Sequence, residues 1–303
     1  MKIRKAHKPM FATAVLSIIA LVAAGCGNST ETGTSPTPSA SPSGAVSTIA
    51  AQVPSSVKAN GALTIAADAT YAPNEFVAAD GRTVIGFDAD LAKALGQALG
   101  LKVNVVNATF DTIIPGLASG KYDLGISSFT DTKEREQTVD FVTYFVAGTS
   151  FYVKSSGGPD IKSLADLCGR TVAAEKGTTQ AADAQDQSAK CKSAGKPSVT
   201  VQVYNDQNAV NLALSSDRAQ VAMADSPVAA YQVKQSKGMF KVTGSPYGTA
   251  PYGIAIPKDS GMADPVLAAM NHLIANGTYL KILAKWGVQA GAITSPAINA
   301  AVS

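Results

Sequence analysis

Residues 110–135, FDTIIPGLASGKYDLGISSFTDTKER, decide the fold class, because a helix, a strand and a run of polar side chains follow one another directly. Residues 112–119 have helical periodicity and end at Gly120, a residue type that commonly ends helices. Residues 124–126 form a short apolar run that predicts a buried strand, and the polar segment 127–135 follows it at once. This succession is typical of an α/β protein whose ligand site lies at the carboxyl ends of its strands.

The same alternation of strands and helices extends over the rest of the chain. Further apolar runs that predict strands are residues 63–67, 102–106, 171–174, 199–203 and 220–224. Residues 88–99 predict a helix, because Leu91, Leu95 and Leu99 recur every four positions on one face. We therefore predict an α/β fold with largely parallel sheets.

Polar residues follow four of the predicted strands. They are Asp68 and Tyr71 after the first, Ser127, Ser128 and Thr130 after the third, Gly177, Thr178 and Thr179 after the fourth, and Asp225 after the sixth. A solvated loop would also explain any one of these positions. Because ligands of open α/β sheets bind beyond the carboxyl ends of strands, the recurrence at four strand ends predicts a binding site.

Arg135 and Asp225 are the charged candidates at this site. We predict that Asp131 or Thr132 caps a helix running through residue 139, which places Arg135 in its first turn. A helix N-terminus favours an anion, and a guanidinium can hold a carboxylate through two parallel hydrogen bonds. Asp225 ends an apolar run, and its carboxylate suits an ammonium. Together they predict a site for a zwitterion.

Two plainer interpretations of these charges stay open. Arg135 could pair only with an acidic neighbour on an exposed helix face, namely Glu134, Glu136 or Asp140. Asp225 could serve as a helix cap, although capping is compatible with binding.

The N-terminal segment predicts export. Four basic residues precede the apolar run 10–24, which is shorter than the ~20 residues that span a bilayer, so residues 1–25 are expected to be a signal peptide. The sequence up to Cys26 resembles a bacterial lipobox, which implies lipidation of Cys26; an ordinary signal peptide is the alternative.

Residues 26–60, rich in Ser, Thr and Pro, are expected to form the lipidated N-terminus and a disordered tether. Without residues 1–25 the net charge falls from +3 to −1, so no nucleic-acid partner is expected.

The remaining cysteines and histidines limit which disulfides, metal sites and catalytic sites the chain can form. Cys168 and Cys191 form an even pair in an exported protein, which predicts a disulfide; two buried thiols are the alternative. Beyond residue 25 the only histidine is His272, so we expect neither a histidine-based triad nor a His-rich metal site, and no metal or cofactor. Residues 116–121 mimic a phosphate loop but lack its spacing, so any ATPase is expected to be a separate chain.

Several motifs resemble the bacterial extracellular solute-binding proteins of family 3, which serve importers of polar amino acids. They are ADATYAP (67–73), GFDADL (86–91), residues 110–123 and 127–135, DF (140–141), GTTQ (177–180), AD (224–225) and the helix 266–287. The resemblance covers residues 61–288 and implies a two-lobed, type II periplasmic-binding-protein fold with crossover hinge segments near 147–151 and 243–249. Lobe 1 is then residues 61–148 plus 247–290, lobe 2 is 149–246, and 291–303 is a tail.

The resemblance also implies roles for single residues. Arg135, Ser128, Thr130, Thr178 and Thr179 would bind an α-carboxylate, with Ser127 beside them, and Asp225 would bind the α-ammonium. Phe110 resembles the aromatic wall of the pocket, while Asp68 and Tyr71, with Glu75 nearby, would form its side-chain end. Two acids at that end favour a cationic or amide side chain. Asn74 departs from the family pattern, in which an aromatic residue stands, and leaves selectivity open.

We therefore expect the substrate-binding component of an ABC importer, not an enzyme. It would capture a polar amino acid by lobe closure and deliver it to a membrane permease. It would act as a monomer on the outer face of the cell membrane, held there by its lipid anchor alone. An extracellular enzyme of the cyclohexadienyl or arogenate dehydratase type, with Glu75 or Asp68 as a lone general acid, is one alternative. A ligand-sensing lipoprotein is another.

Overall fold

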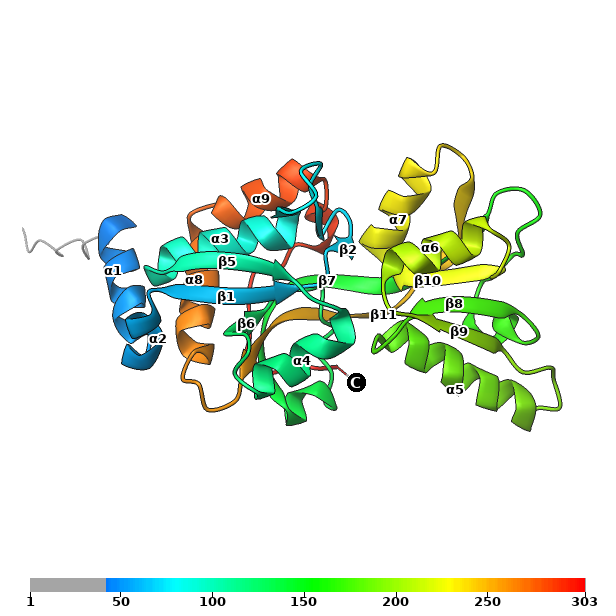
Figure 1. The fold of residues 1–303 in the computed structure, drawn as a ribbon, viewed down its shortest axis with the longest axis horizontal. Coiled ribbons are helices and arrows are strands. Elements are labelled where there is room, and N and C mark those ends of the chain that lie inside the picture. The colour runs from blue at the N-terminus through cyan, green and yellow to red at the C-terminus, as the bar shows by residue number, and fades with distance from the viewer. Residues whose placement is uncertain (1–41, 303) are drawn as a thin grey trace, which may run out of the picture. The chain divides into compact units, whose positions relative to one another are not determined.

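Short apolar strands build both halves of the molecule and two long strands connect them (Figure 1). The computed structural model describes residues 42–302, so the predicted signal peptide and Cys26 lie outside the described residues. Eight strands form one continuous sheet in the order β5-β1-β6-β11-β7-β10-β8-β9. The two long strands, β7 (Val139–Lys154) and β11 (Phe240–Pro257), run antiparallel through its centre. The strands on either side of them make two α/β lobes, as predicted.

Lobe 1 is a sheet with helices on both faces. β1 (Ala62–Ala67) lies parallel to β5 (Lys102–Asn107) and to β6 (Leu124–Gly125). Alternate side chains of a strand point to opposite faces, so Leu63 and Ile65 pack on one helical layer and Ala66 on the other. The first layer is α3 (Phe87–Leu99), α8 (Ala263–Ala275) and α9 (Thr278–Trp286), and the second is α4 (Phe110–Ala118). A small sheet of β2 (Thr70–Tyr71), β3 (Glu75–Val77) and β4 (Val84–Ile85) completes the lobe.

Lobe 2 repeats this plan. β8 (Thr171–Glu175) pairs in parallel with β9 (Thr200–Tyr204) and with β10 (Val221–Asp225). One face packs on α5 (Thr179–Ser193), and the other on α6 (Gln207–Ser215) and α7 (Ser226–Gln235). The predicted disulfide between Cys168 and Cys191 is present and joins α5 to the end of the short helix η2 (Leu164–Leu167). The six predicted short strands are thereby confirmed, and their partners are mostly parallel.

The two long strands pair with each other from one end to the other and take one further partner in each lobe. β11 also pairs with β6 in lobe 1, and β7 also pairs with β10 over Thr149–Tyr152 in lobe 2. The register between β7 and β11 shifts on both sides of Tyr247, within the predicted crossover segments. We propose that the boundaries between the lobes lie at these shifts.

Residues 42–60 contradict the prediction of a disordered tether up to residue 60. They form α1 (Pro42–Gln52) and α2 (Ser55–Asn60). Ile49 in α1 and Val53, which directly follows α1, are 6% and 2% exposed and join the core of lobe 1. Ala50 also lies close to Gly100, since a Cβ added at Gly100 would be 3.2 Å from the Ala50 methyl group. The Ser- and Pro-rich composition concealed these few apolar contacts.

The predicted helix from residue 131 to 139 is also wrong. Only the 3-10 helix η1 (Arg135–Gln137) forms, because β7 already begins at Val139. Thr132 still caps the turn, since its hydroxyl accepts a hydrogen bond from the Arg135 amide at 3.2 Å. The Asp131 carboxylate instead accepts one from the amide of Ala300, whose segment lies along β7 near an isolated bridge between Val142 and Ile298.

Within residues 42–302 no helix is long and apolar enough to cross a membrane.

Candidate functional site

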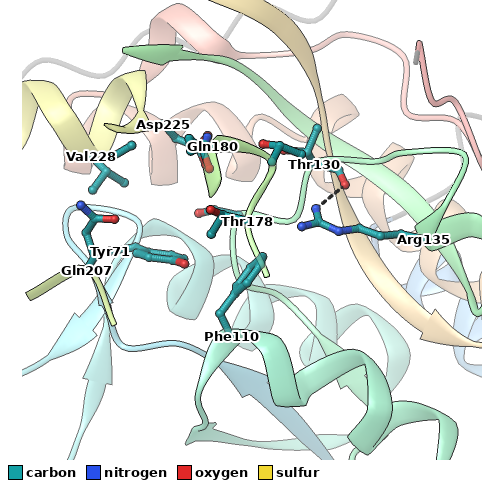
Figure 2. A pocket seen from close by; sticks show the side chains of 12 residues that line it. Tyr71, Phe110, Thr130, Arg135, Thr178, Gln180, Gln207, Asp225 and Val228 are labelled. Atoms are coloured by element: carbon teal, nitrogen blue, oxygen red, sulfur yellow. Dashed lines mark hydrogen bonds between the residues drawn. The ribbon is translucent and has the colours of Figure 1, made fainter. Parts of the chain in front are cut away.

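A cavity lies where the two lobes meet, and both lobes supply its walls (Figure 2). The empty space among its lining atoms is about 340 Å³, open solvent at the mouth included. Lobe 1 contributes Tyr71, Phe110, Ser128, Thr130 and Arg135, and lobe 2 contributes Thr178, Thr179, Gln180, Gln207, Ala224, Asp225 and Val228. Eight of these twelve residues belong to the predicted site. The carboxyl ends of strands from both lobes therefore face one another across it.

Arg135 is held at the cavity by two backbone carbonyls, one from each lobe. Its Nη1 donates to the carbonyl oxygen of Thr130 at 2.8 Å, and Nη2 donates to that of Gly177 at 2.9 Å. The guanidinium carbon lies 5.3 Å from the centre of the Phe110 ring, within reach of a cation–π contact. Burial lowers the pKa of Arg135, while the charge of Asp225 raises it. A guanidinium has five N–H donors, so some remain for a ligand.

The N-terminus of α5 faces the same cavity. Gly177 adopts φ +78° just before the helix, a left-handed conformation that suits glycine. The Thr178 hydroxyl accepts from the Ala181 amide at 3.2 Å and donates to the Glu175 carbonyl at 2.7 Å, so it is occupied as the N-cap. The first backbone N–H groups of the helix have no partner inside it and can receive an anion.

Asp225 lies at the end of β10, directly before α7. It occupies the N-cap position, but its side chain makes no capping hydrogen bond. Its Oδ1 instead accepts from Gln180 Nε2 at 2.7 Å, and the same nitrogen donates to Thr149 Oγ1 at 3.0 Å on crossing strand β7. Burial raises the pKa of Asp225 to about 6, although hydrogen bonds and the charge of Arg135 lower it. The carboxylate is thus not used as a cap and gains from a positive partner.

Aromatic rings line the side of the cavity between these charges. Figure 2 shows Arg135 and Asp225 on different sides, with the rings of Tyr71 and Phe110 along a third. The centres of these two rings are 5.8 Å apart, and Phe110 stacks on Phe129 at 4.6 Å. Opposite charges beside an apolar wall can hold a zwitterion by its charged groups and its aliphatic stem.

Asp68 is buried and does not line the cavity. It is 2% exposed, and its carboxylate accepts from Thr70 Oγ1 at 2.6 Å and from the Phe110 amide at 3.0 Å. Burial raises its pKa. Asp68 therefore supports the loop that carries Tyr71 and the start of α4.

Glu75 and Ser127 lie beneath the cavity, and neither lines it. Glu75 is fully buried and accepts from the hydroxyls of Ser127 at 2.9 Å and Ser128 at 3.3 Å. The Ser127 hydroxyl also accepts from the Asp68 amide at 2.8 Å, which joins the strand ends of lobe 1. The structure thus places Glu75 in an internal network and not at the expected side-chain end of a pocket. Burial first, and then the charge of Asp88, raise the pKa of Glu75 well above its usual range.

Several cavity residues were missed by sequence reasoning. Gln180 lies in the GTTQ motif but was not predicted as a site residue, and Gln207 follows β9, whose end was not part of the predicted site. The amide of Gln207 donates to Thr70 Oγ1 at 3.2 Å across the lobes, and its side chain donates to the Tyr152 hydroxyl at 2.8 Å. Inspecting the end of every predicted strand would have found Gln207. Val228 gave no signal, because an apolar residue on a helix resembles a core residue.

Comparison with known proteins gives consistent results. Residues 63–289 match the family described as bacterial extracellular solute-binding proteins, family 3. The arginine-binding protein ArgT of Corynebacterium glutamicum is 34% identical over 252 residues, which is 83% of this chain and 82% of that protein.

Solved structures show the same likeness. An ancestral arginine-binding protein bound to glutamine aligns with a TM-score of 0.68 and 37% identity over 75% of this chain and 98% of its own. An ancestral amino acid-binding protein described as a precursor of cyclohexadienyl dehydratase aligns with a TM-score of 0.66 and 34% identity, over 77% of this chain and 98% of its own.

Proposed function

Because this chain belongs to the bacterial extracellular solute-binding proteins of family 3, we propose that it is the substrate-binding component of an ABC importer. It captures a polar amino acid with a cationic or amide side chain between its lobes and delivers it to a membrane permease. The names of its relatives support this, since they describe binding of arginine and of glutamine. Arginine and glutamine share an α-carboxylate and an α-ammonium and differ in the side chain.

In this proposal the two ends of the amino-acid backbone contact different lobes. Arg135, with Ser128 and Thr130 beside it, binds the α-carboxylate together with the N-terminus of α5, and Asp225 binds the α-ammonium. The rings of Tyr71 and Phe110 pack on the stem. The observation that carries the proposal is the pairing of Arg135 and Asp225 at one cavity, each with hydrogen-bonding capacity to spare.

Closure of the lobes follows from this division of contacts. A ligand held by both lobes binds the closed form more tightly than the open form, so it shifts the population toward closure. Excluding water strengthens the two charged contacts, because the local dielectric falls. The closed molecule then presents to the permease a surface that the open molecule lacks.

The anchoring of the protein completes the proposal. Cys26 carries the lipid and holds the protein, as a monomer, on the outer face of the cell membrane. No cofactor is required for this function.

A calorimetric survey tests the proposal. Residues 42–303 are titrated with each common amino acid, and the tightest ligand is titrated again into Arg135→Ala and Asp225→Ala. We expect one or a few ligands of submicromolar affinity, weakened at least about 100-fold by either substitution. Tight binding that survives both substitutions contradicts the proposed contacts.

An extracellular dehydratase is the second candidate, and its support is the likeness to a precursor of such an enzyme. Such an enzyme needs a protonated carboxyl group, and burial raises the pKa of Glu175 to about 10, although Glu175 does not line the cavity. Incubation with prephenate and with arogenate, followed by product analysis, separates the two functions. Turnover that Glu175→Gln abolishes would establish the enzyme.

A further inference from the structure

The C-terminal segment, residues 297–301, lies along one edge of β7 in lobe 1. It lies outside residues 63–289, which match the family. Ile298 forms an isolated antiparallel bridge with Val142 of β7, and its side chain packs against the core of lobe 1. In lobe 2 the second neighbour of β7 is β10. The segment therefore takes, beside the lobe-1 half of the strand, the place that β10 takes beside the other half.

Asn299 fastens this segment to β7. Its amide donates to the Phe141 carbonyl at 2.9 Å, and its Oδ1 accepts from the Phe141 amide at 2.8 Å. Its Nδ2 donates to Asp140 Oδ1 at 2.9 Å. Two residues earlier, the Ala297 amide donates to Thr143 Oγ1 and the Ala297 carbonyl accepts from the Thr143 amide, both at 2.9 Å. These bonds give the segment a fixed register on the strand.

Residues 300–301 supply two consecutive amide N–H groups to the turn that carries Arg135. The first donates to Asp131 Oδ2 at 2.7 Å, and the second donates to Glu136 Oε1 at 3.1 Å. Asp131 directly follows Thr130, whose carbonyl accepts from the guanidinium, and Glu136 directly follows Arg135 itself. The segment thus holds the turn on both sides of Arg135.

Asp131 depends on this segment for a hydrogen bond. It is fully buried, and its Oδ1 has no hydrogen-bond partner within residues 42–302. Burial raises the pKa of Asp131 to about 6, whereas the hydrogen bond from the Ala300 amide lowers it. Without that donor the buried carboxylate would lose the bond to Oδ2 as well, which is costly. We therefore expect the turn to rearrange when the segment is absent.

We propose that residues 297–301 position Arg135 for its contact with the ligand carboxylate, acting through the positioning residues Asp131 and Glu136. The inference rests on the proposed amino-acid binding and adds to it a segment that does not line the cavity. The turn itself is short, since the 3-10 helix η1 has only three residues. Because paired charge-assisted hydrogen bonds need a fixed geometry, a small displacement of the guanidinium should cost affinity.

A truncation and a pair of substitutions at Ala300 test the inference. The truncated chain ends at Pro296. Ala300→Pro removes the N–H that Asp131 accepts from and restricts the backbone of Asn299, whereas Ala300→Ser keeps the N–H and is the matched control. The tightest-binding amino acid and its α-carboxamide, which lacks the carboxylate charge, are each titrated calorimetrically. Circular dichroism and thermal unfolding check that each variant is folded.

We expect the truncation and Ala300→Pro to weaken binding of the amino acid at least about tenfold, and binding of the carboxamide by less than about threefold. Ala300→Ser should bind both ligands as the wild type does. Equal weakening of the two ligands overturns the inference, because a segment that only covers the edge of β7 would not distinguish them. So does unchanged binding in a folded variant. If the truncated chain does not fold, Ala300→Pro supplies the same test.

The same titrations separate this inference from the proposed function. Binding that Arg135→Ala abolishes and that folded Ala300→Pro leaves unchanged overturns the positioning role and leaves the proposed function intact. Absence of binding of every common amino acid to the wild type overturns both.

Discussion

Arg135 is positioned by contacts that a lysine cannot reproduce. Its guanidinium reaches the carbonyls of Thr130 and Gly177 at once and lies against the Phe110 ring. A lysine ammonium offers one compact charge and neither the fork nor the flat surface. One side chain therefore links the lobes, and its geometry suits the proposed contact with a carboxylate.

Arg135→Lys should weaken binding of the amino acid by about 10- to 100-fold, since at least one charge-assisted hydrogen bond is lost. Calorimetry of the tightest ligand measures the change. Lys133→Ala is the control, because Lys133 is exposed and pairs only with Glu136. If Lys133→Ala weakens binding while Arg135→Lys, which keeps the charge, does not, then net charge and not the geometry of Arg135 controls affinity.

Asp225 should make binding weaken in acid. Burial raises its pKa to about 6, so below that pH the free protein carries a neutral carboxyl that an ammonium cannot bind well. The proton must leave when ligand binds, and Kd should rise by up to about tenfold per pH unit below pH 6. Titrations between pH 4.5 and 8 measure how Kd depends on pH.

Asp225→Asn should bind weakly at every pH, and its Kd should depend less on pH than that of the wild type. If Kd of the variant rises in acid as steeply as that of the wild type, another group causes the acid effect.

Single residues also show how far sequence reasoning reaches. Arg135 and Asp225 could be found because each follows an apolar strand, and charge at that place is conspicuous. The sequence does not show whether the side chains of Glu75 and Glu175 point into the interior of their own lobe or toward the other lobe. Glu75 follows a loop of the predicted pocket yet points into the interior, and Glu175 ends a strand yet faces the other lobe. Which way a side chain points depends on tertiary packing.

At the scale of elements, α1 adds a piece of core that composition did not reveal. Ile49→Ala should lower the free energy of unfolding by about 2 kcal/mol, because it removes a buried side chain at the edge of the core. Thr48→Ala, on the exposed side of the same helix, should change it by less than about 0.5 kcal/mol. Urea denaturation measures both. Indistinguishable variants would mean that α1 does not pack on lobe 1.

The disulfide should stabilise lobe 2 without affecting the site. Cys168 and Cys191 are 23 positions apart, and a loop of this length predicts a loss of about 3 kcal/mol when both are replaced by alanine. Denaturation with and without reductant gives the comparison. Ligand affinity should stay the same, since neither cysteine lines the cavity. A large loss of affinity in the folded variant would show that the bridge positions α5.

Element types were predictable where periodicity was strong. The short strands and the helix with leucines every four residues appear as expected, because each buries one apolar face. The crossing strands β7 and β11 were placed only by resemblance, since their buried residues continue through both lobes without a break in pattern. The predicted helix at residues 131–139 is only the short turn η1, because β7 begins two residues after η1 ends.

At the scale of the whole molecule, the described structure has its lobes in contact. Arg135 bonds to Gly177, the Gln207 amide bonds to Thr70, and Lys176 pairs with Asp111, so three polar contacts cross between the lobes. Gly177 approaches lobe 1 so closely that a Cβ there would lie 2.9 Å from the Asp111 Cβ.

Gly177→Ala should therefore hinder closure. The added methyl group would meet Asp111 only when the lobes are together, so affinity should fall while each lobe stays folded. Gly195→Ala is a matched control, because Gly195 also has a positive φ in lobe 2 but has open space around it. Small-angle scattering with and without ligand should show less compaction for Gly177→Ala than for the control. Equal compaction would contradict the close approach at this turn.

The most direct test of the account uses the tightest-binding amino acid and its α-carboxamide, in which a neutral amide replaces the carboxylate. Each is titrated into the wild type and into Arg135→Ala. We predict that the wild type prefers the amino acid by roughly 100-fold, and that Arg135→Ala loses most of this preference because the carboxylate has lost its partner. A wild type that binds the carboxamide equally well, or an Arg135→Ala variant that keeps the full preference, would contradict the claim that this cavity grips an amino acid by its backbone charges.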